Sequence, residues 1–245
     1  MNLFGLTDTG LVRKSNQDSY AIRVLGDDLA IAVICDGMGG AQAGNVASAV
    51  AVEAFAAALE SACKEGVPPD ADSKCNLLRA ACKAANSQVY ELSCANPEYE
   101  GMGTTLVAAL ILSHEIYVVN VGDSRCYIWS EDGLKQITTD HSLVQALVDI
   151  GDITPEEART HPKKNLITRA LGIDASVNSD VFRVERNPKN ALLLCSDGMS
   201  NVVEDKTIEE VLGSQMPPQA AATRLLSLTV EQGAPDNVTI ITAQL

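Results

Sequence analysis

Two strand-like stretches that end in the same three residues constrain this chain more than any other feature. The apolar run 31–35 leads into an Asp-Gly-Met that begins at Asp36, and the run 191–195 leads through Ser196 into a second that begins at Asp197. A short apolar run that stops at glycine is typical of a buried strand followed by a sharp turn. We expect both carboxylates at one edge of a core, where they repel unless a cation or a shared proton lies between them.

Composition limits the class of protein. The chain has 245 residues, of which 46% are hydrophobic and 20% charged, enough for a sizeable core. Its net charge of −14 disfavours binding to nucleic acid or to an anionic membrane. The carboxylate excess is compatible with divalent cations, although a solvated acidic face explains most of it. No basic segment precedes an apolar stretch at the N-terminus, and we find no apolar run of the ~18 residues that cross a bilayer.

The cysteines indicate a reducing compartment. There are seven, an odd number, and no two have Cys-x-x-Cys spacing. Cys35, Cys126 and Cys195 lie in strand-like apolar runs, where cysteine acts as a small hydrophobic residue. We therefore expect reduced thiols and a cytoplasmic location rather than a disulfide framework or a zinc site.

Hydrophobic periodicity predicts the order of the elements. Strands are expected at 20–24, 31–35, 104–112, 116–121, 126–129, 134–138, 177–184, 191–195 and 237–244. Helices are expected at 43–63, 73–96, 142–150, 154–160, 206–212 and 218–231. Consecutive strands with long helices inserted in pairs indicate an α+β fold with mainly antiparallel sheets. Since we find no linker, we expect one domain over 1–245.

Four aspartates share one kind of position. Asp36, Asp123, Asp197 and Asp236 each lie beside a glycine or a turn at the end or start of a predicted buried strand. Carboxylate, carbonyl and water oxygens are the ligands of magnesium and manganese. Each aspartate taken singly is better explained as a turn residue. Taken together, with the two Asp-Gly-Met copies, the four leave the turn and metal interpretations equally open on spacing alone.

The chain resembles a known family in eight motifs that follow one another in the family's order. It is similar to the bacterial metal-dependent serine/threonine protein phosphatases of the PPM or PP2C type. The motifs are Arg13-x-x-Asn16-Gln17-Asp18, Asp36-Gly37-Met38-Gly39-Gly40, Gly103-Thr104-Thr105, Val121-Gly122-Asp123-Ser124-Arg125, Asp140-His141-Ser142, Ile167-Thr168-Arg169-Ala170-Leu171-Gly172, Ser196-Asp197-Gly198 and Asp236-Asn237-Val238-Thr239. The resemblance implies an antiparallel β-sandwich flanked by pairs of antiparallel helices.

The resemblance also implies a metal site. Asp36 would bridge two Mn²⁺ or Mg²⁺ ions, with the carbonyl of Gly37 on one of them. Asp197 and Asp236 would complete the other, and Asp18 would hold metal-bound water. In bacterial members Asp123, together with Asp197, would bind a weaker third ion.

By the same resemblance the chain hydrolyses phosphoserine and phosphothreonine in proteins. Arg13 would bind the substrate phosphate, because a guanidinium matches phosphate oxygens bidentately. A surface charge before a turn is the alternative interpretation of Arg13. The implied partners are phosphorylated proteins, namely serine/threonine kinases and their substrates, and we expect a monomer.

Two positions depart from the pattern of many bacterial members. Ala41 stands where a histidine is common and Asn45 where a glutamate is common, so the acid that protonates the leaving group is open and metal-bound water is one candidate. Of the histidines, His141 is interpreted as a structural hydrogen-bonding residue. His114 and His161 are interpreted as surface residues, although His161 lies where it could touch substrate.

Residues 140–172 correspond to the family's flap, the part that varies with substrate, and we expect this segment to be mobile. Lys163 and Lys164 would meet an acidic phosphoprotein there, or are ordinary solvated lysines. Two other functions remain open. One is a pseudophosphatase that binds phosphoprotein without turnover, and the other is a phosphatase of a small phosphorylated metabolite.

Overall fold

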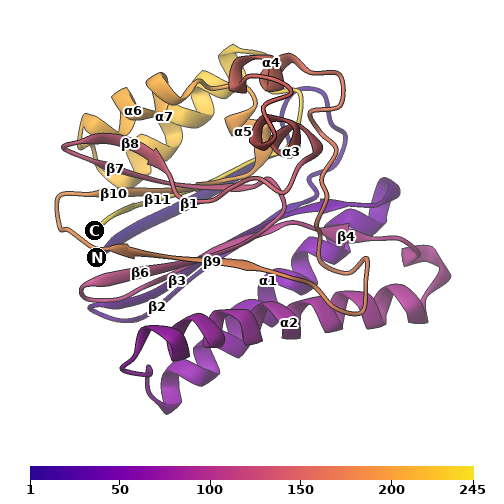
Figure 1. Ribbon diagram of the computed structural model, residues 1–245, viewed down its shortest axis with the longest axis horizontal. Coiled ribbons are helices and arrows are strands. Elements are labelled where there is room, and N and C mark those ends of the chain that lie inside the picture. The colour runs from indigo at the N-terminus through magenta and orange to yellow at the C-terminus, as the bar shows by residue number, and fades with distance from the viewer.

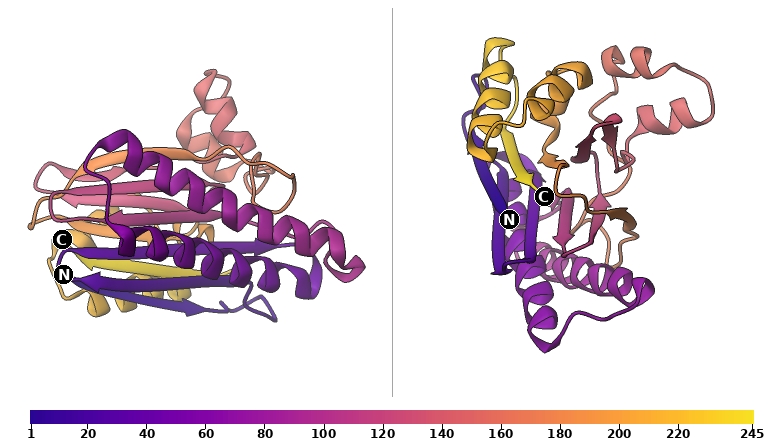
Figure 2. Two further views of the ribbon diagram at one scale, coloured as in Figure 1. Left: turned by 90° about the horizontal axis from the view of Figure 1, so that it is seen from below. Right: turned by 90° about the vertical axis from the view of Figure 1, so that its left-hand side faces the viewer.

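Two antiparallel β-sheets packed face to face form the centre of the molecule, and helices cover both outer faces (Figures 1 and 2). The computed structural model describes residues 1–245, except for the side chains of residues 40–42. Ala41, which stands where a histidine is common in the family, therefore has its side chain outside the described part. The expected α+β sandwich with paired helices is confirmed.

The chain crosses repeatedly between the two sheets. One sheet has the order β1-β11-β10-β7-β8, with bounds Asn2–Asp8, Val238–Gln244, Ala191–Cys195, Arg125–Ser130 and Gly133–Gln136. The other has the order β2-β3-β5-β6-β9, with bounds Asp18–Gly26, Leu29–Met38, Leu106–Ile111, Glu115–Val121 and Asp180–Glu185. The short β4 (Gly103–Thr104) pairs with the end of β3. All these strand pairs are antiparallel.

Alternating side chains of buried strands fill two layers of core at once. In β3, Ala32 and Ile34 point into the core between the sheets, whereas Ile31, Val33 and Cys35 point to the helices. This period of two is why the strand is continuously apolar in sequence. On the other sheet, Leu193 and Cys195 of β10 face a third cluster beneath the C-terminal helices.

The helices pair on each outer face. Helix α1 (Gly40–Glu65) and helix α2 (Ala71–Ala95) cover the sheet that contains β3, and α6 (Asp205–Gly213) and α7 (Pro218–Glu231) cover the other. Residues Ala43–Glu65 are long and apolar enough to cross a membrane, so the expectation that no such stretch exists was wrong. Half of that window is buried, and Ala47, Ala51 and Phe55 pack into the core, as in the core helix of a globular domain.

The segment that precedes β9 holds two short helices. They are α3 (Leu143–Asp149) and α4 (Pro155–Thr160), and a single 3-10 turn, η1 (Pro97–Tyr99), follows α2. The predicted helix start at Thr154 is confirmed, because the Thr154 side chain and the Glu157 side chain form a capping box. The sequence pattern does not predict α5 (Asp197–Ser200), a four-residue helix that begins at one of the candidate ligands.

Candidate active site

Four carboxylates and one guanidinium from distant parts of the chain line one cavity at an end of the sandwich. Its volume is about 480 Å³, and its lining includes Arg13, Asp36, Asp123, Asp197 and Asp236. Asp36 lies near the end of β3, Asp197 at the start of α5, and Asp123 and Asp236 beside strand ends, whereas Arg13 lies in the loop between β1 and β2. Five separate segments of the chain therefore supply the cavity.

Asp18 lies beneath this cavity and is buried. It pairs with Asp36 across the ladder between β2 and β3, which sets the two acids side by side. Its Oδ2 accepts hydrogen bonds of 2.7 Å from both Ser196 and Thr239, whereas its buried Oδ1 has no hydrogen-bond partner. Burial raises the pKa of Asp18 to about 6, and the two hydroxyl hydrogen bonds limit the rise.

Asp36 is held through its backbone. Its N–H donates to Thr105 Oγ1 over 3.0 Å, and its carbonyl accepts from Thr104 Oγ1 over 2.8 Å and from the Thr105 N–H over 2.9 Å. These contacts explain the Gly-Thr-Thr motif, whose role the sequence did not show. Burial raises the pKa of Asp36 well above its ordinary value, and the neighbouring Asp18 and Asp197 raise it further.

Gly37 fits its position only as glycine. A Cβ there would lie 2.0 Å from the carbonyl oxygen of Gly44, which packs against it from α1. The Gly37 N–H donates to the carbonyl of Gln17 over 3.1 Å, so the strand end and the N-terminal loop are joined next to Asp36. The close approach fixes the peptide whose carbonyl is a candidate ligand.

Asp197 begins α5 and lies in the cavity wall. Its Oδ2 accepts from Asn201 Nδ2 over 2.9 Å, and its buried Oδ1 has no hydrogen-bond partner. Burial raises the pKa of Asp197, and the neighbouring carboxylate of Asp236 adds to the rise.

Asp123 follows Gly122 at the end of β6 and is buried. Gly122 has φ of 108°, and a Cβ there would lie 2.6 Å from Thr105 Cγ2, so this turn requires glycine. Burial raises the pKa of Asp123 well above its ordinary value, with Asp197 and Asp140 adding to the rise. The carboxylate therefore belongs to the same charged cluster as Asp197, as expected.

Arg13 and Asp236 pair at the mouth of the cavity. Arg13 Nη2 donates to Asp236 Oδ2 over 2.7 Å, and the Arg13 side chain is 52% exposed. Asn237, which the sequence marks only as part of a motif, fixes the loop that carries Arg13. Its Oδ1 accepts from the Gln17 N–H over 2.8 Å, and its Nδ2 donates to the carbonyl oxygens of Thr9 and Ser15 over 2.9 and 3.0 Å.

The side chains of the cavity have the chemistry to bind divalent cations, but their donor atoms do not form a complete coordination sphere. Two buried carboxylate oxygens, on Asp18 and Asp197, have no hydrogen-bond partner, and such oxygens are expensive to bury unless a cation compensates them. Among the described residues, however, no three Asp, Glu, His or Cys side chains have their donor atoms gathered around one point. The physical reason is that Asp236 is turned to Arg13 and one Asp18 oxygen to two hydroxyls.

The described histidine side chains lie outside the carboxylate cluster. His141 is buried, its Nδ1 accepts the Gly122 N–H over 3.1 Å, and its Nε2 lies 3.2 Å from Asp180 Oδ2. This agrees with the expected hydrogen-bonding role. His114 is exposed, and His161 Nδ1 accepts a local hydrogen bond from the Lys163 N–H.

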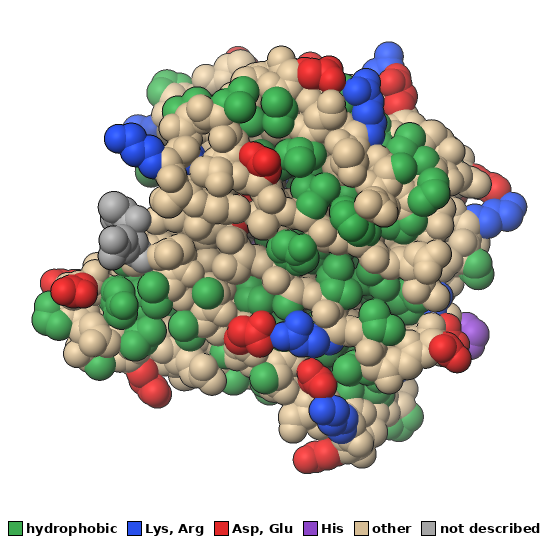
Figure 3. Space-filling view, turned by 180° about the vertical axis from the view of Figure 1, so that it is seen from behind, with side chains coloured by type: hydrophobic (Ala, Val, Ile, Leu, Met, Phe, Trp, Pro, Cys, Tyr) green, Lys and Arg blue, Asp and Glu red, His purple; other side chains and the backbone are tan. Residues whose placement is uncertain are grey.

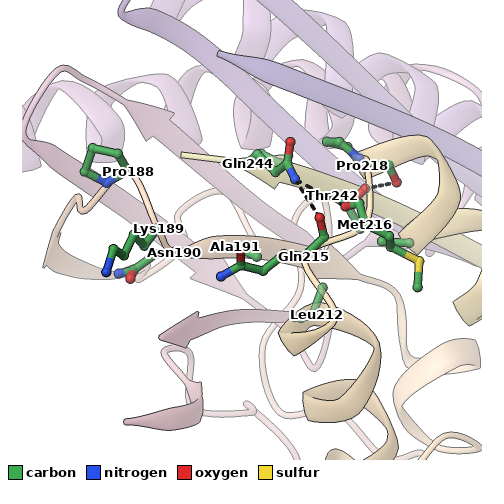
Figure 4. A pocket seen from close by; sticks show the side chains of 12 residues that line it. Pro188, Lys189, Asn190, Ala191, Leu212, Gln215, Met216, Pro218, Thr242 and Gln244 are labelled. Carbon is green, nitrogen blue, oxygen red and sulfur yellow. Dashed lines mark hydrogen bonds between the residues drawn. The ribbon is translucent and has the colours of Figure 1, made fainter. Parts of the chain in front are cut away.

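A separate cavity of about 320 Å³ lies at the opposite end of β10 and β11 (Figure 4). Its polar groups satisfy one another, because Thr242 donates to the carbonyl of Pro218 over 2.7 Å and Gln244 Nε2 lies 3.3 Å from the carbonyl of Gln215. None of the candidate site residues lines it.

Comparisons with known proteins identify the family of this chain. The protein phosphatase 2C family model matches residues 12–233. A serine/threonine phosphatase stp of Listeria welshimeri is 37% identical over 96% of this chain and 92% of that protein. The serine/threonine protein phosphatase PstP of Mycobacterium tuberculosis is 42% identical over 98% of this chain and 44% of its own length.

Solved structures show the same architecture. Serine/threonine phosphatase Stp1 of Staphylococcus aureus superposes with a TM-score of 0.90 at 38% identity, covering 99% of this chain and 94% of that one. The catalytic domain of PstP in complex with two manganese ions superposes with a TM-score of 0.83 at 40% identity, covering 99% and 97%. Fold and sequence agree, and the chain belongs to the protein phosphatase 2C family.

Proposed function

We propose that this chain is a metal-dependent phosphatase that hydrolyses phosphoserine and phosphothreonine esters in proteins. The observation that carries the proposal is one cavity in which Asp36, Asp123, Asp197 and Asp236 face Arg13, with partnerless buried oxygens on Asp18 and Asp197. The names of the relatives, serine/threonine phosphatases at up to 42% identity, support the same reaction.

We assign the ion ligands to the carboxylate cluster. Asp36 and the carbonyl of Gly37 would hold ions on the side of β3, and Asp197 and Asp236 on the side of the other sheet. Two divalent ions, when bound, polarise the phosphoryl oxygens and lower the pKa of a water molecule. The PstP structure is in complex with two manganese ions, which supports the binding of two ions here. A third, weaker ion at Asp123 and Asp197 is part of the proposal.

The remaining steps belong to the chain's own residues. Arg13 binds two phosphate oxygens with its planar guanidinium and orients the ester. Hydrolysis by a water molecule needs no side-chain nucleophile. Asp18 Oδ1, buried and without a partner, accepts a hydrogen bond from the attacking water and orients it. Ser196 and Thr239 hold the other Asp18 oxygen in place.

The substrate class follows from the shape of the cavity. Arg13 and Lys14 are exposed in its lining, so the cavity opens to solvent and admits a side chain that projects from a protein. A deep closed pocket would instead favour a small metabolite. Among the side chains described on the face shown in Figure 3, acidic and basic groups are scattered singly or in pairs. This distribution supports protein partners rather than nucleic acid or a membrane surface.

We further propose that residues 1–245 act as one catalytic domain whose flap, residues 140–172, contacts substrate. The same proposal includes a cytoplasmic location, a monomer, and phosphorylated kinases and their substrates as partners. Free, mostly buried thiols are typical of a reducing environment, and this supports the proposed cytoplasmic location.

A phosphopeptide assay tests the function. The chain is depleted of ions with a chelator, then assayed for phosphate release from a phosphothreonine peptide with added Mn²⁺ or Mg²⁺. We expect no release without ions, full release after addition, and none from Asp36→Asn. Asp132→Asn, in the exposed turn between β7 and β8, is the matched control. Binding of phosphopeptide without release would favour a pseudophosphatase, and faster release from small sugar phosphates would favour a metabolite enzyme.

A further inference from the structure

We propose that a groove beside the carboxylate cavity binds an apolar residue of the substrate polypeptide, two or three positions from the phosphorylated residue. This inference rests on the proposed function and specifies the substrate sequence that the site prefers. The groove, called here the side groove, has a volume of about 530 Å³. It is lined by Met38, by residues 165–170 and by residues that follow Gly172, including Ile173.

The side groove is continuous with the carboxylate cavity. Met38, Asn165 and Ile167 line both. Met38 ends β3 two residues after Asp36, so the two Cα atoms are about 7 Å apart along an extended strand. A bound peptide also rises about 3.3 Å per residue. A phosphorylated residue at the carboxylates therefore brings its second or third neighbour to the groove.

Gly103 lies beneath the junction of the side groove and the carboxylate cavity. A Cβ on Gly103 would lie 2.8 Å from Met38 Cε and 2.9 Å from Ile173 Cδ1, so both side chains pack directly over this residue. Met38 and Ile173 consequently present adjacent apolar atoms at the point where the side groove begins. Any larger residue at position 103 would push the two side chains apart.

Ile173 is exposed but rigidly supported. Its side chain is 44% exposed, whereas its neighbours in the chain are held by a buried residue of α2. Asn86 Oδ1 accepts the Gly172 N–H over 2.9 Å, and Asn86 Nδ2 donates to the carbonyl of Asp174 over 3.0 Å. Leu171 exchanges two backbone hydrogen bonds with Thr104. The loop therefore holds an apolar side chain toward solvent in a fixed position.

Leu166 is presented in the same way. Its side chain is 52% exposed, and its carbonyl accepts the Leu143 N–H over 2.8 Å. The next residues are also fixed, because Ile167 bridges to Ser142 and the Thr168 N–H donates to the carbonyl of His141 over 2.7 Å. Preorganised apolar groups bind a ligand with a smaller loss of conformational entropy than mobile ones do.

The chemistry of the groove favours an apolar occupant over a charged one. A single exposed apolar side chain is ordinary on a protein surface, but Leu166, Ile173 and Met38 line one hollow. The lining also has polar members, namely Asn165, Thr168, Asp174, Ser176 and Asn178, so the apolar occupant is matched to the part that Leu166, Ile173 and Met38 form. Its arginine, Arg169, is already engaged, since Nη1 donates to Asp180 Oδ1 over 3.0 Å. An aliphatic residue of the substrate polypeptide, continuous with the phosphorylated residue next door, matches this lining.

The test uses paired phosphothreonine peptides and the full chain with Mn²⁺. One peptide of each pair carries leucine two and three positions from the phosphothreonine, on the N-terminal or the C-terminal side, and its partner carries serine there. We expect kcat/KM to be about tenfold higher for the leucine peptide on one side, the effect of one apolar group in a partly open pocket. The double variant Leu166→Ser, Ile173→Ser should lose that preference while hydrolysing p-nitrophenyl phosphate at the wild-type rate.

Val24→Ser is the matched control. Val24 is 60% exposed on β2, six residues from Asp18 and so about 20 Å away along the strand, and its substitution should leave the preference intact. Equal kcat/KM for both peptides of every pair, or a preference that survives in the double variant, would overturn the inference while p-nitrophenyl phosphate turnover upholds the proposed function. Loss of turnover on every substrate by the wild-type chain would overturn both. A change in sedimentation of the double variant, with unchanged peptide preference, would assign the groove to a second copy of the chain instead.

Discussion

Arg13 Nη2 donates to Asp236 Oδ2 over 2.7 Å, which joins the residue assigned to substrate phosphate with a residue assigned to metal. The pair spans 223 positions of sequence and lies at the open mouth of the cavity, with side chains 52% and 30% exposed. Exposed ion pairs contribute only about 0–1 kcal/mol, so phosphate or a cation can displace one partner at little cost. The contact therefore couples phosphate binding at Arg13 to metal binding at Asp236, and either residue can leave the pair when its ligand binds.

Arg13→Ala tests that coupling. We expect KM for a phosphothreonine peptide to rise at least tenfold, because a bidentate contact to phosphate is lost. Manganese affinity should stay equal or increase, since Asp236 no longer shares its charge with a guanidinium. Calorimetry with Mn²⁺ and steady-state kinetics measure the two quantities separately. Arg13→Lys, which keeps the charge but not the fork, should be intermediate, and a collapse of manganese affinity in Arg13→Ala would show a structural role.

Asp123→Ala tests the proposed third ion. The carboxylate is buried beside Asp197 but is not assigned to either core ion, so the variant should keep two tight manganese sites. It should lose much of its turnover on phosphopeptides. Manganese titration followed by thermal melting is run beside the peptide assay. A folded variant with wild-type turnover would remove the third site and leave Asp123 as a residue of the turn.

Glu115 gives a prediction on acid stability. It accepts hydrogen bonds of 2.9 Å from Lys74 Nζ and from the Tyr117 hydroxyl, and it also pairs with Arg183, which joins α2 to β6 and β9. The hydrogen bond from Lys74 is the main cause that lowers the pKa of Glu115 to about 2 from an ordinary 4.5. A lowered carboxyl pKa contributes stability that is complete above pH 4.5 and is lost as pH falls toward 2.

Glu115→Gln should therefore lose about 1–3 kcal/mol near pH 7, because Lys74 is left buried with its charge unpaired. The difference from wild type should shrink as pH falls from about 4.5 toward 2. Urea unfolding at a series of pH values measures this. Glu131→Gln removes an exposed pair with Lys189 and should leave the stability close to that of wild type. A difference between wild type and Glu115→Gln that stays constant over that pH window would contradict the assignment.

The cysteines predict a phosphatase that needs no thiol. Of the seven, Cys94 is exposed and Cys75 is partly buried, whereas the other five are buried. Burial raises the pKa of Cys35, Cys126 and Cys195, which keeps these thiols protonated and unreactive. Iodoacetamide should modify Cys94 first, with no loss of turnover, and Cys94→Ser should be fully active. Mass spectrometry counts the modified sites, and inactivation in step with Cys94 labelling would refute the prediction.

The strand pattern predicted an α+β fold with antiparallel sheets because buried strands carry a strong signal, and the resemblance to the family implied the sandwich. Runs such as 31–35 are apolar on both faces, and the capping box at Thr154 and the proline at the start of α7 mark helix boundaries locally. It missed α5, since four residues are too few to show a helical period. It also placed the last residue of α6 one position early, because Gly213 is within the helix rather than after it.

The sequence indicated which residues belong to the candidate site, but it did not indicate which of their atoms contact one another. Asp36 and Asp197 can be recognised in the sequence because each follows a strand-like apolar run. The hydroxyls that hold Asp18 belong to Ser196 and Thr239, which lie 178 and 221 positions from Asp18 in the sequence. No local pattern links residues at that separation. The fold of β1, β2 and β11 is likewise needed to see two further contacts. These are the ion pair between Arg13 and Asp236 and the hydrogen bond by which Asn237 holds the N-terminal loop.

Manganese binding by Asp36→Asn tests most directly the claim that the carboxylate cluster holds two ions. The substitution keeps the shape of the side chain but removes the proposed bridging charge. Isothermal titration calorimetry of the ion-depleted wild type should show two tight sites, and Mn²⁺ should raise its Tm. In Asp36→Asn both effects should disappear, while the Tm without ions should be equal or higher because a partly buried carboxylate that repels its neighbours is gone. Two tight manganese sites in folded Asp36→Asn would contradict the account.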